Sequence, residues 1–506
     1  MKKKIVTIKE LRQILDKIRN RKNIVHCHGV FDLLHIGHIK HFQKAKSFGD
    51  ILIVSITSDA NVNKAPGRPK FNDNLRSEAI ASIQCVDYVV VSNDATSLKI
   101  INIIKPNFYC KGNDYKNNKL DLTGNISKET RLVRKFGGKI IYTNEISFSS
   151  SNLINSYLSN YSKDQIKNLA NIKKKYNFGK INNIIKNFEK LKVLVIGELI
   201  IDEYVFSEAV GKSGKEPMLT LREMLSEKYL GGAAVVARHI STFCNKITLI
   251  SMIGQKQEDN SFIKKNISKN INIKLIRKNK SPTILKKRFI EHLSNNKILG
   301  VYKINDNPLE EQDEYKLQKL INQEIKKHDL VIVSDYGHGF LSKKSIKLIL
   351  DKSKFLAVNS QINSFNIGLH GIRNYKNLDC VIINEKEMRH ELRSRDGDLK
   401  KLTTQLCKEQ KIKKLIVTRG TDGAIMYDNK IKTFFSSAAY SDKSLDKVGS
   451  GDAMLAIISL CLKQNLDQDL SLFISSIAGA LTVSSIGNKN NVTKQQILRS
   501  LENLLK

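Results

Sequence analysis

A chain of 506 residues is longer than one hydrophobic core usually organises, so the sequence predicts two or three domains. Hydrophobic residues make up 41% and charged residues 26% of the chain, which excludes a disordered, fibrous or low-complexity protein. The net charge of +36 comes from 85 lysine and arginine residues against 49 acidic ones, but the excess is mostly scattered lysine. We therefore interpret the charge as compositional drift and expect no nucleic-acid partner.

The cysteines and the N-terminus predict a soluble, cytoplasmic protein with no membrane partner. The 7 cysteines form no Cys-x-x-Cys pair, and their odd number and wide spacing fit reduced thiols better than a disulfide framework or a zinc site. Charged residues from Lys9 to Lys17 interrupt any apolar core of a signal peptide. No run approaches the ~18 consecutive apolar residues that a membrane span needs.

In chain order, the first elements are typical of an α/β domain over residues 1–156. Short apolar runs at 24–27, 51–56, 86–91 and 139–142 have the character of buried strands, and helical segments separate them. Strands that alternate with helices favour a parallel sheet with crossover connections. We expect residues 157–189, which are rich in lysine and asparagine, to form a linker and a leading helix.

A second, larger α/β series is predicted over residues 190–506. Its strands are expected at 193–196, 330–333, 380–383 and 415–417, and a long apolar helix follows Gly451. Two segments, around 205–230 and 283–304, alternate in the manner of extended chain. We predict that they form a small β lid over a substrate.

A candidate anion-binding motif follows the first strand, with the sequence His-Gly-Val-Phe-Asp-Leu-Leu-His-Ile-Gly-His over residues 28–38. His35 and His38, three residues apart at the start of a helix, would lie on one side, beside free helix N-terminal amides. Nucleotidyl transfer needs such donors, because a phosphate attacks the α-phosphorus of a nucleotide through a crowded, charged transition state. We predict both histidines as catalytic and Lys46 as a ligand of the β- and γ-phosphates. Taken alone, two histidines at this spacing are more often a coincidence of the surface or of metal binding.

The context of this motif resembles the cytidylyltransferase-like nucleotidyltransferases, and most closely the adenylyltransferase domain of the bifunctional heptose kinase/adenylyltransferase family of lipopolysaccharide synthesis. The stretches that carry the resemblance are 67–69, 75–76, 85–90, 111–115 and 146–154. It implies a Rossmann-like domain that binds ATP or CTP. The nucleotide-binding residues that it implies, besides His35 and His38, are Phe31, Asp32, Lys46, Lys111, Asp114, Ser149, Ser150 and Ser151.

The second candidate motif is Gly449-Ser450-Gly451-Asp452, which directly precedes the apolar helix. Small residues allow close backbone approach, and the first helical amides point toward a transferring phosphoryl group. Asp452 is placed to take a proton from a sugar hydroxyl as it attacks the γ-phosphate of ATP. The same pattern is equally typical of a structural helix cap. A P-loop around Lys212 is excluded, because position 206 is phenylalanine where that motif needs glycine.

Further matches are found at 384–387 and 418–423, together with 197–202 and 231–232. In order and approximate spacing they resemble the ribokinase-type, phosphofructokinase-B-like sugar kinases over about residues 190–506, again nearest to the heptose family. The resemblance implies a ribokinase-like fold with a β lid, and it implies that Asn384 and Glu387 bind Mg²⁺ through water. The nucleotide-binding residues that it implies are Thr418, Gly420, Gly423, Gly449, Ser450 and Gly451. The substrate-binding residues that it implies are Asp202, Gly231, Gly232, Lys286, Arg288 and Asp335.

Three positions depart from the pattern of that family, which usually has asparagine, lysine and threonine where this chain has Val235, His338 and Lys447. The first two touch the presumed sugar pocket, so the substrate can differ from the heptose phosphate. The order of the two domains is also reversed, with the transferase first.

Together, the two motifs predict a bifunctional enzyme of nucleotide-sugar synthesis. The C-terminal domain would phosphorylate a sugar or sugar phosphate, similar to heptose 7-phosphate, with ATP and Mg²⁺. The N-terminal domain would transfer a nucleotidyl group to a sugar 1-phosphate and release pyrophosphate. One alternative is a cytidylyltransferase for an alditol or glycerol phosphate, fused to a kinase of different sugar specificity. Another is a basic RNA-binding or regulatory protein built on decayed enzyme domains, against which the intact motif residues argue. Lids of this type often dimerise, so a homodimer is expected.

Overall fold

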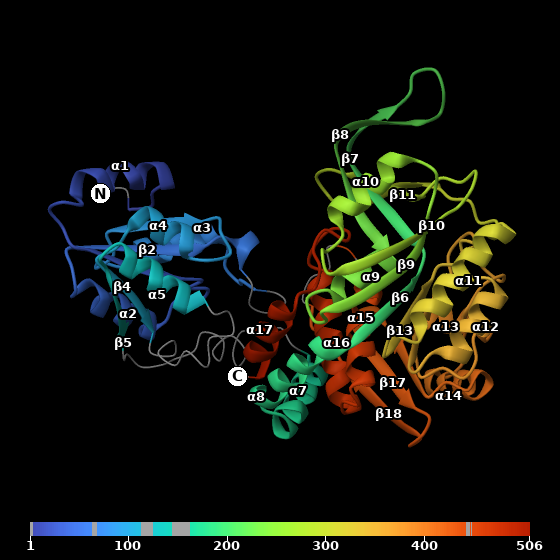
Figure 1. The fold of residues 1–506 in the computed structure, drawn as a ribbon. Helices are drawn as coiled ribbons and strands as arrows, with labels where there is room; N and C mark the ends of the chain where they lie inside the picture. Colours follow the sequence, from blue (N-terminus) through green and yellow to red (C-terminus); the bar gives the residue numbers. More distant parts are fainter. Residues whose placement is uncertain are drawn as a thin grey trace. The chain divides into compact units, whose positions relative to one another are not determined.

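The computed structural model of the chain describes residues 4–62, 68–112, 125–143, 162–441, 446 and 448–505. The chain divides into two compact units (Figure 1), of which the first contains Met1–Asn160 and Leu498–Lys506 and the second Tyr161–Ile497. Among the described residues, no helix combines the length and the apolar character that a membrane crossing requires.

The first unit is built on a five-stranded parallel sheet with the order β3-β2-β1-β4-β5. Its strands are β1 Ile24–Gly29, β2 Ile51–Thr57, β3 Tyr88–Ser92, β4 Phe108–Gly112 and β5 Lys139–Thr143. Its helices include α1 Ile8–Ile18, α2 Ile36–Lys46, α3 Asp73–Ala81, α4 Leu98–Ile104 and α5 Asn125–Lys135. Strand order reverses between β1 and β4, and in such folds ligands bind beyond the carboxyl ends of the strands at this switch point. The predicted Rossmann-like fold is confirmed, with β4 as a strand that the sequence prediction did not contain.

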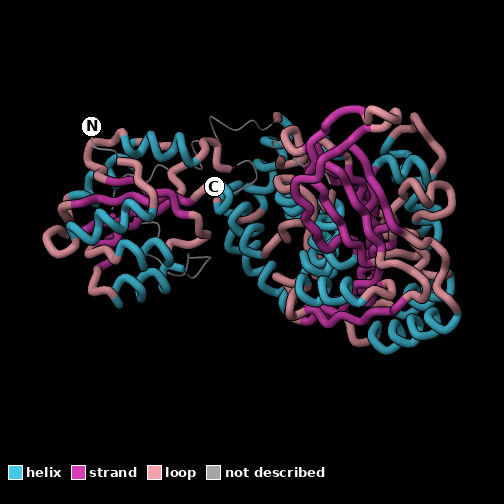
Figure 2. Tube along the Cα trace, turned by 90° about the horizontal axis from the view of Figure 1, so that it is seen from above, coloured by secondary structure: helices cyan, strands magenta, loops and turns pink. Residues whose placement is uncertain are grey.

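The second unit contains a nine-stranded sheet with the order β10-β9-β6-β13-β14-β15-β16-β17-β18, which Figure 2 shows between layers of helices. Its strands are β6 Lys192–Gly197, β9 Lys246–Ile253, β10 Ile271–Arg277, β13 Leu330–Asp335, β14 Leu356–Ser360, β15 Cys380–Asn384, β16 Lys414–Thr418, β17 Ala424–Asp428 and β18 Thr433–Ser437. Only β17 and β18 run antiparallel to their neighbours. The strands at the centre are buried on both faces, as their continuous apolar runs predict.

Helices cover this sheet and supply one of the two candidate motifs. They are α9 Ala233–Ile240, α10 Gln257–Asn266, α11 Glu311–Ile325, α12 Lys343–Lys352, α13 Glu385–Glu391, α14 Leu399–Gln410, α15 Ser450–Lys463 and α16 Gln468–Thr482. The last helix, α17 Lys494–Leu505, has residues in both units. Helix α15 is the predicted apolar helix after the glycine-rich turn, and its residues from Ala453 to Leu462 are buried.

The predicted β lid is confirmed as a separate four-stranded sheet with the order β12-β11-β7-β8. Its strands are β7 Leu199–Lys212, β8 Leu219–Gly232, β11 Ile284–Glu291 and β12 Lys297–Lys303. The first predicted segment is an antiparallel hairpin of two 14-residue strands, longer than the alternating pattern indicated. Strands β7 and β11 pair in parallel, which joins the two hairpins into one sheet.

The segment expected to be a linker and a leading helix is, from Ser162 onward, helical and attached to the second unit. It contains α7 Lys163–Lys175 and α8 Phe178–Lys186, and Ser162 begins α7 with a capping box. The Asn168 side chain donates to the Ser436 carbonyl over 3.0 Å and accepts from the Tyr440 hydroxyl over 2.5 Å. These bonds fix α7 at the β18 edge of the large sheet.

Candidate active sites

In the first unit, the two motif histidines meet where α2 begins, directly after the loop that leaves β1. His35 is the N-cap residue of α2, and its Nδ1 accepts the Gly37 amide over 3.1 Å. The His35 and His38 rings stack with centroids 3.9 Å apart and an interplanar angle of 26°. Both side chains are half-buried, so solutes reach them. Partial burial lowers the pKa of His35, which keeps its imidazole neutral near pH 7.

The predicted residues Phe31 and Asp32 lie in the loop that leads to this histidine pair, and both are buried. The Phe31 ring packs edge-on against His38 at 5.3 Å, and a Cβ at Gly29 would come within 2.9 Å of that ring. Asp32 is buried and accepts hydrogen bonds from the backbone amides of Lys70 (2.7 Å) and Phe71 (3.1 Å). An ion pair of 3.1 Å joins its other oxygen to the guanidinium of Arg68. Asp32 therefore anchors the segment that starts at residue 68.

Lys46 is not brought to this histidine pair. It is the last residue of α2, and its ammonium lies 2.5 Å from an Asp87 carboxylate oxygen. Asp87 precedes β3, so this end of α2 lies at the amino ends of the strands. At the helical rise, eight residues separate the Cα atoms of His38 and Lys46 by about 12 Å. The spacing of residues in the sequence does not show whether a helix ends beside the amino ends or the carboxyl ends of the strands.

A buried polar network lies beside the histidine pair at the carboxyl ends of the strands. Lys111, at the end of β4, forms an ion pair of 3.3 Å with Glu129. His28 Nδ1 lies 2.8 Å from the Ser55 hydroxyl, and burial, aided by the charge of Lys111, lowers the pKa of His28 to about 3. His28 is therefore neutral at physiological pH. The sequence predicted Lys111 here but assigned no role to His28, although it opens the motif.

Arg76 is a fully buried arginine that sequence analysis did not assign to the site. Its guanidinium donates to the carbonyls of Val30 (2.6 Å), Thr57 (2.9 Å) and Phe71 (2.9 Å). It thereby holds the loop after β1 against the end of β2. Its only sequence signal was its place in one of the stretches that carry the family resemblance. The predicted residues Asp114, Ser149, Ser150 and Ser151 lie outside the described residues.

In the second unit, the glycine-rich turn forms the start of α15. Gly449 is the N-cap residue with φ of 85°, and a Cβ there would lie 2.2 Å from Asn488 Oδ1, so glycine is required. Nothing lies within 4 Å of a Cβ built at Gly451, so the backbone at this position borders open space. The helix N-terminus and its amides favour an anion at this place. Ser450 is the first residue of the helix.

Asp452 lies in the first turn of α15 and is partly exposed. Its Oδ1 accepts the hydroxyl hydrogen of Tyr336 over 2.9 Å. Desolvation raises the pKa of Asp452 to about 7, and the negative charge of Asp202 adds to this shift, whereas the Tyr336 hydrogen bond and the charge of Lys286 oppose it. A carboxylate whose pKa is close to neutral is well matched to accept a proton and to give it up.

Residues of the lid strands gather beside Asp452. In the β7–β11 pairing, Asp202 lies opposite Lys286, and Arg288 forms an ion pair of 2.5 Å with Asp202. The Lys286 ammonium lies 5.4 Å from the centre of the Tyr336 ring, whose hydroxyl bonds Asp452. The predicted substrate residues Asp202, Lys286 and Arg288 are thus brought together with the predicted catalytic carboxylate.

The two glycines at the end of β8 allow close approaches to Asp202 and to Glu198. A Cβ at Gly231 would lie 2.2 Å from Asp202 Oδ2. Gly232 has φ of 61°, and a Cβ there would lie 2.2 Å from the Glu198 carbonyl oxygen. Both positions therefore need glycine for a close approach, and Gly232 also needs it for its turn into α9.

Asp335 is buried, and protein donors occupy both of its carboxylate oxygens. The Tyr375 hydroxyl donates to Oδ2 over 2.6 Å and the Gly337 amide to Oδ1 over 3.1 Å. Desolvation raises the pKa of Asp335 to about 6. The structure therefore places this predicted substrate ligand behind Tyr336, where it holds the turn that follows β13.

Glu198 holds the same turn and was missed by the sequence analysis. It is buried at the end of β6 and accepts the backbone amides of Tyr336 and His338, each over 2.9 Å. Burial raises the pKa of this carboxyl group. Its only sequence signal was its place in a stretch, residues 197–202, that carries the family resemblance.

The predicted magnesium residues form a capping box at the start of α13. Asn384 Oδ1 accepts the Glu387 amide, and Glu387 Oε2 accepts the Asn384 amide, each over 2.8 Å. Desolvation raises the pKa of Glu387 to about 7, and the charge of Asp452 contributes to the shift. Among the described residues, no group of three or more His, Cys, Asp or Glu side chains is arranged to hold a metal. A divalent cation near the Glu387 and Asp452 carboxylates would relieve the repulsion between them.

Thr418 lies beside Asn384, because the two residues are paired at the carboxyl ends of β15 and β16. The turn from β16 to β17 contains the predicted residues Gly420 and Gly423, with φ of 58° and 79°. A Cβ at Gly423 would lie 2.1 Å from the Ser437 carbonyl oxygen, so this position requires glycine. The predicted nucleotide-binding residues at the end of β16 and in the turn after it thus lie, like Asn384, at the carboxyl ends of the parallel strands.

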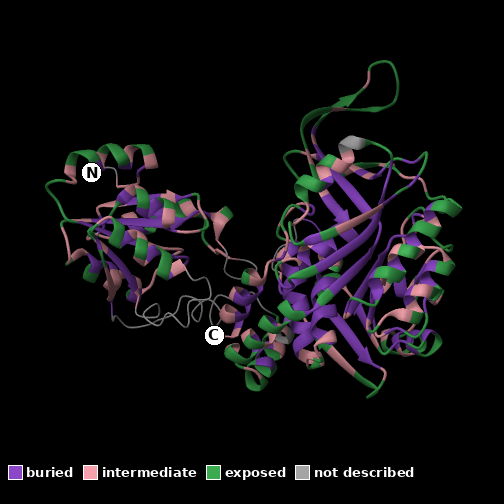
Figure 3. Cartoon of the chain, viewed as in Figure 1, coloured by how far each residue is buried: buried purple, intermediate pink, exposed green. Residues whose placement is uncertain are grey.

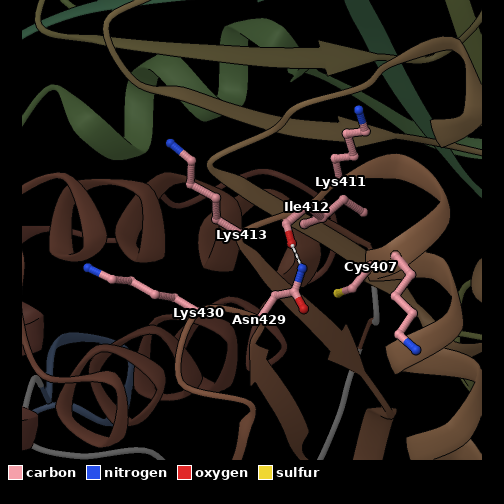
Figure 4. Close-up of a pocket in the computed structure, with 7 residues that line it drawn as sticks. Cys407, Lys411, Ile412, Lys413, Asn429 and Lys430 are labelled. Carbon is pink, nitrogen blue, oxygen red and sulfur yellow. Dashed lines mark hydrogen bonds between the residues drawn. The ribbon is translucent and has the colours of Figure 1, made fainter.

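A surface pocket of about 490 Å³ lies at the opposite edge of this sheet (Figure 4). Lys413 and Asn429 lie at the amino end of β16 and after β17, at the edge opposite Thr418. The remaining lining residues are Cys407, Lys408, Lys411, Ile412 and Lys430. The pocket is therefore separate from the groups around Asp452.

Comparison with protein families agrees with this geometry. Residues 190–495, more than half of the chain, match the model of the pfkB family of carbohydrate kinases. The chain belongs to the pfkB carbohydrate kinase family. Residues 26–156, which contain the stacked histidines, match the cytidylyltransferase-like model. The chain thus joins a pfkB kinase unit to a cytidylyltransferase-like unit, as the two motifs predicted.

Curated relatives of this pfkB protein include several called "Bifunctional protein HldE". The protein of Syntrophotalea carbinolica is 35% identical over 162 residues, which are 31% of this chain and 32% of the relative. That of Helicobacter pylori strain G27 is 43% identical over 136 residues, which are 26% of this chain and 28% of the relative. The matched part therefore spans about a third of the length of these relatives.

Among solved structures, the pfkB unit is similar to phosphofructokinase-2 from Escherichia coli. The structure in complex with potassium is 16% identical with a TM-score of 0.52, and the match covers 62% of this chain and all of that one. The complex with substrates and products gives a TM-score of 0.51 at the same identity and coverage. At this identity the likeness shows the fold alone, which confirms the ribokinase-like architecture.

Proposed function

We propose that the chain is a bifunctional enzyme of nucleotide-sugar synthesis. Its pfkB unit phosphorylates a sugar phosphate similar to heptose 7-phosphate with ATP, and its N-terminal unit transfers a nucleotidyl group to a sugar 1-phosphate. The observation that carries the proposal is the position of Asp452 at the start of α15, bonded to Tyr336 and next to the lid residues Lys286 and Asp202. The curated relatives, which are called bifunctional proteins HldE, support the pairing of activities and do not favour a transferase for alditol phosphates.

In the proposed kinase reaction, Asp452 takes the proton from a sugar hydroxyl, whose oxygen attacks the γ-phosphorus of ATP. The bond from that phosphorus to the ADP oxygen breaks, and ADP leaves. Amides at the start of α15 stabilise the charge on the transferring phosphoryl group. Mg²⁺, held through water near Asn384 and Glu387, would neutralise the nucleotide phosphates. Lys286 and Arg288, with two positive charges on one lid strand, favour an acceptor that itself carries an anionic group.

In the proposed transfer reaction, a phosphate oxygen of the sugar 1-phosphate attacks the α-phosphorus of the nucleotide, and pyrophosphate leaves. Imidazole N–H groups of His35 and His38 donate hydrogen bonds to the oxygens that gain charge in the transition state. The stacked rings at the N-terminus of α2 support this role. We infer ATP or CTP as the nucleotide of this unit.

Product analysis tests both reactions in one experiment. The protein is incubated with Mg²⁺, ATP, CTP and a panel of sugar phosphates and sugar 1-phosphates, and products are identified by mass spectrometry. We expect a sugar bisphosphate from the pfkB unit and one nucleotide-sugar with pyrophosphate from the other. Competition between ATP and CTP identifies the base. The absence of both products across the panel would contradict the proposal.

The kinase activity is expected to fall as the pH is lowered through about 7. Asp452 must be ionised to accept the hydroxyl proton, and its pKa of about 7 lies above the usual value of an aspartate. Below that pH the value of kcat/KM should therefore drop by about tenfold per pH unit, and above it the value should level off. ADP release measured from pH 5.5 to 9 checks this profile. A rate independent of pH over this range would exclude Asp452 as the proton acceptor.

We also propose that the lid sheet joins two copies of the chain. Large apolar side chains are exposed on both lid hairpins, seven of them by 45% to 56%, and Figure 3 shows the outer part of the β7–β8 hairpin as exposed. These seven are Val210, Met218, Leu219, Met224, Leu225, Leu299 and Val301. Exposed apolar side chains on a lid sheet are typical of an interface.

Leu299 and Val301 lie two residues apart on β12, so they share a face of the lid sheet. Replacing both by aspartate is expected to convert a dimer into a monomer, because charges are desolvated in the interface. Sedimentation velocity at several concentrations measures this change. The exposed Ile431, in the turn after β17, provides the control variant Ile431→Asp. A wild-type protein that stays monomeric at all concentrations would contradict the dimer.

A further inference from the structure

His338, in the turn after β13 of the pfkB unit, has one ring nitrogen without a visible role. The side chain is fully buried, and its backbone amide donates to Glu198 over 2.9 Å. Its Nδ1 lies 2.7 Å from a carboxylate oxygen of Asp306, in the loop that follows the lid strand β12. Nε2 is also buried and has no hydrogen-bonding partner among the residues that the structure describes. Buried polar atoms without a hydrogen-bonding partner are unfavourable, so we expect a ligand to form a hydrogen bond with Nε2.

The chemistry of Asp306 decides which proton His338 carries. An ionised carboxylate accepts hydrogen bonds and donates none, so Nδ1 must hold the hydrogen that lies between the two groups. Burial lowers the pKa of His338, which keeps the ring in its neutral form. A neutral imidazole has a single N–H, so Nε2 is left with a lone pair and no proton. The orphan atom is therefore a hydrogen-bond acceptor that needs a donor.

Ring contacts connect His338 to the catalytic region. Its ring lies edge-on to Phe365, with centroids 6.5 Å apart, and Phe365 lies 6.1 Å from Tyr302. The ammonium of Lys286 lies 5.8 Å from the Tyr302 ring and 5.4 Å from the ring whose hydroxyl bonds Asp452. His338 thus lies close to the groups that surround Asp452, and the charge of Lys286 acts on its ring.

Phe365 is an exposed residue whose ring packs edge-on against the buried His338. Its side chain is 50% exposed, so little packing holds it in place. Exposed side chains change rotamer within nanoseconds, so this ring is free to turn away from His338.

We propose that His338 Nε2 determines specificity in the kinase site by accepting a hydrogen bond from a hydroxyl of the sugar substrate. The inference rests on the proposed kinase function and narrows its substrate class. The acceptor sugar places a donor hydroxyl at His338, and its phosphate lies toward Lys286 and Arg288. A phosphate at the His338 position would bring only acceptor oxygens to an acceptor nitrogen, so substrates that need an anion bound there are rejected.

Equilibrium binding without ATP tests this inference separately from turnover. Heptose 7-phosphate and the other sugar phosphates of the panel are titrated calorimetrically into the full-length protein, together with monodeoxy and monodeoxyfluoro analogues of the best ligand. We expect one hydroxyl whose removal weakens binding on the order of 10- to 100-fold. The deoxyfluoro analogue at the same carbon should bind as weakly as the deoxy sugar, because fluorine donates no hydrogen bond.

Two variants assign that hydroxyl to His338. His338→Phe keeps a ring but lacks the acceptor, so it should bind the parent sugar as weakly as the wild type binds the deoxy analogue. This variant should also bind the parent sugar and the deoxy analogue equally well. His338→Gln offers an amide oxygen near the position of Nε2 and should restore part of the preference. The exposed His292, between β11 and β12, provides the control variant His292→Gln, which should bind like the wild type. Thermal melting identifies any variant that fails to fold.

The tautomer is measured in the free protein by ¹⁵N NMR of labelled histidine, with the His338 signal assigned through His338→Gln. A proton found on Nε2 would overturn the inference whatever the binding data. Equal discrimination between the parent sugar and its deoxy analogue by the wild type and both His338 variants would also overturn the inference. In that case, phosphorylation that depends on Asp452 would leave the proposed kinase function standing. A wild-type protein that binds no sugar of the panel would overturn both.

Discussion

Replacing Asp452 by asparagine is expected to reduce sugar phosphorylation by about 10²- to 10⁴-fold, which is the usual contribution of a general base. Asparagine has nearly the same shape and can still accept the Tyr336 hydrogen bond, but it cannot take up the hydroxyl proton. The loss should therefore appear in kcat, with little change in the binding of the sugar. ADP release in the presence of the best sugar phosphate measures it.

The same variant offers two internal controls. Nucleotidyl transfer by the N-terminal unit should be unchanged, because its chemistry depends on other residues. The variant should also melt at the same or a higher temperature at pH 8. Folding raises the pKa of Asp452 to about 7, so its ionisation costs stability that builds up from about pH 4, the ordinary pKa of an aspartate, and is fully present above pH 7. Asp351→Asn, at an exposed carboxylate on α12, should keep full activity. Full kinase activity of Asp452→Asn would refute the assignment.

Replacing His35 or His38 by asparagine is expected to lower nucleotidyl transfer by about 10²- to 10³-fold for each, as for other donors to a developing charge. Asparagine is a good N-cap residue, so His35→Asn preserves the start of α2 while it removes the imidazole. Pyrophosphate release in the presence of a sugar 1-phosphate measures the effect. The double variant should lose less than the product of the single losses, because the stacked rings act on one transition state.

His41 provides the matched control for the histidine pair. It lies on the same helix one turn further along, and its Nδ1 is 2.7 Å from the Thr143 hydroxyl. His41→Asn is expected to change nucleotidyl transfer by less than about threefold, since its imidazole takes no part in the proposed chemistry. Kinase activity should be unaffected in all of these variants. An equal loss in the His41 variant would mean that the histidine substitutions act through the fold of the unit and not through the reaction.

Much of the fold could be predicted because its signals are local. The run at 51–54 is continuously apolar, and the glycine-rich turn at Gly449 directly precedes an apolar helix, so each identifies its element within a few residues. Strand β4 escaped the prediction because Lys111 and Gly112 end its short apolar run. The edge strand β18 gives a weak signal, since a strand that is only partly buried resembles a loop in a short window.

The candidate sites were predictable only in part. Spacing alone indicated that His35 and His38 would share one side of a helix, and the structure stacks their rings. Spacing could not indicate that Lys46 pairs with Asp87 at the far end of the same helix. It also gave no hint that Glu198 holds the turn of His338, because that contact joins the ends of two strands about 140 residues apart in the chain.

By itself, the sequence determined that the chain contains two α/β units and that each unit has a helix whose first residues are suited to binding phosphate. These features can be read from the sequence because periodicity, glycine turns and helix starts are properties of neighbouring residues. Only the tertiary structure decided that Asp452 meets Tyr336 and the lid cations, and that His338 keeps an unpaired acceptor. These pairings depend on which strands lie next to each other. Strand order arises from the packing of the whole core, so no short stretch of sequence predicts it.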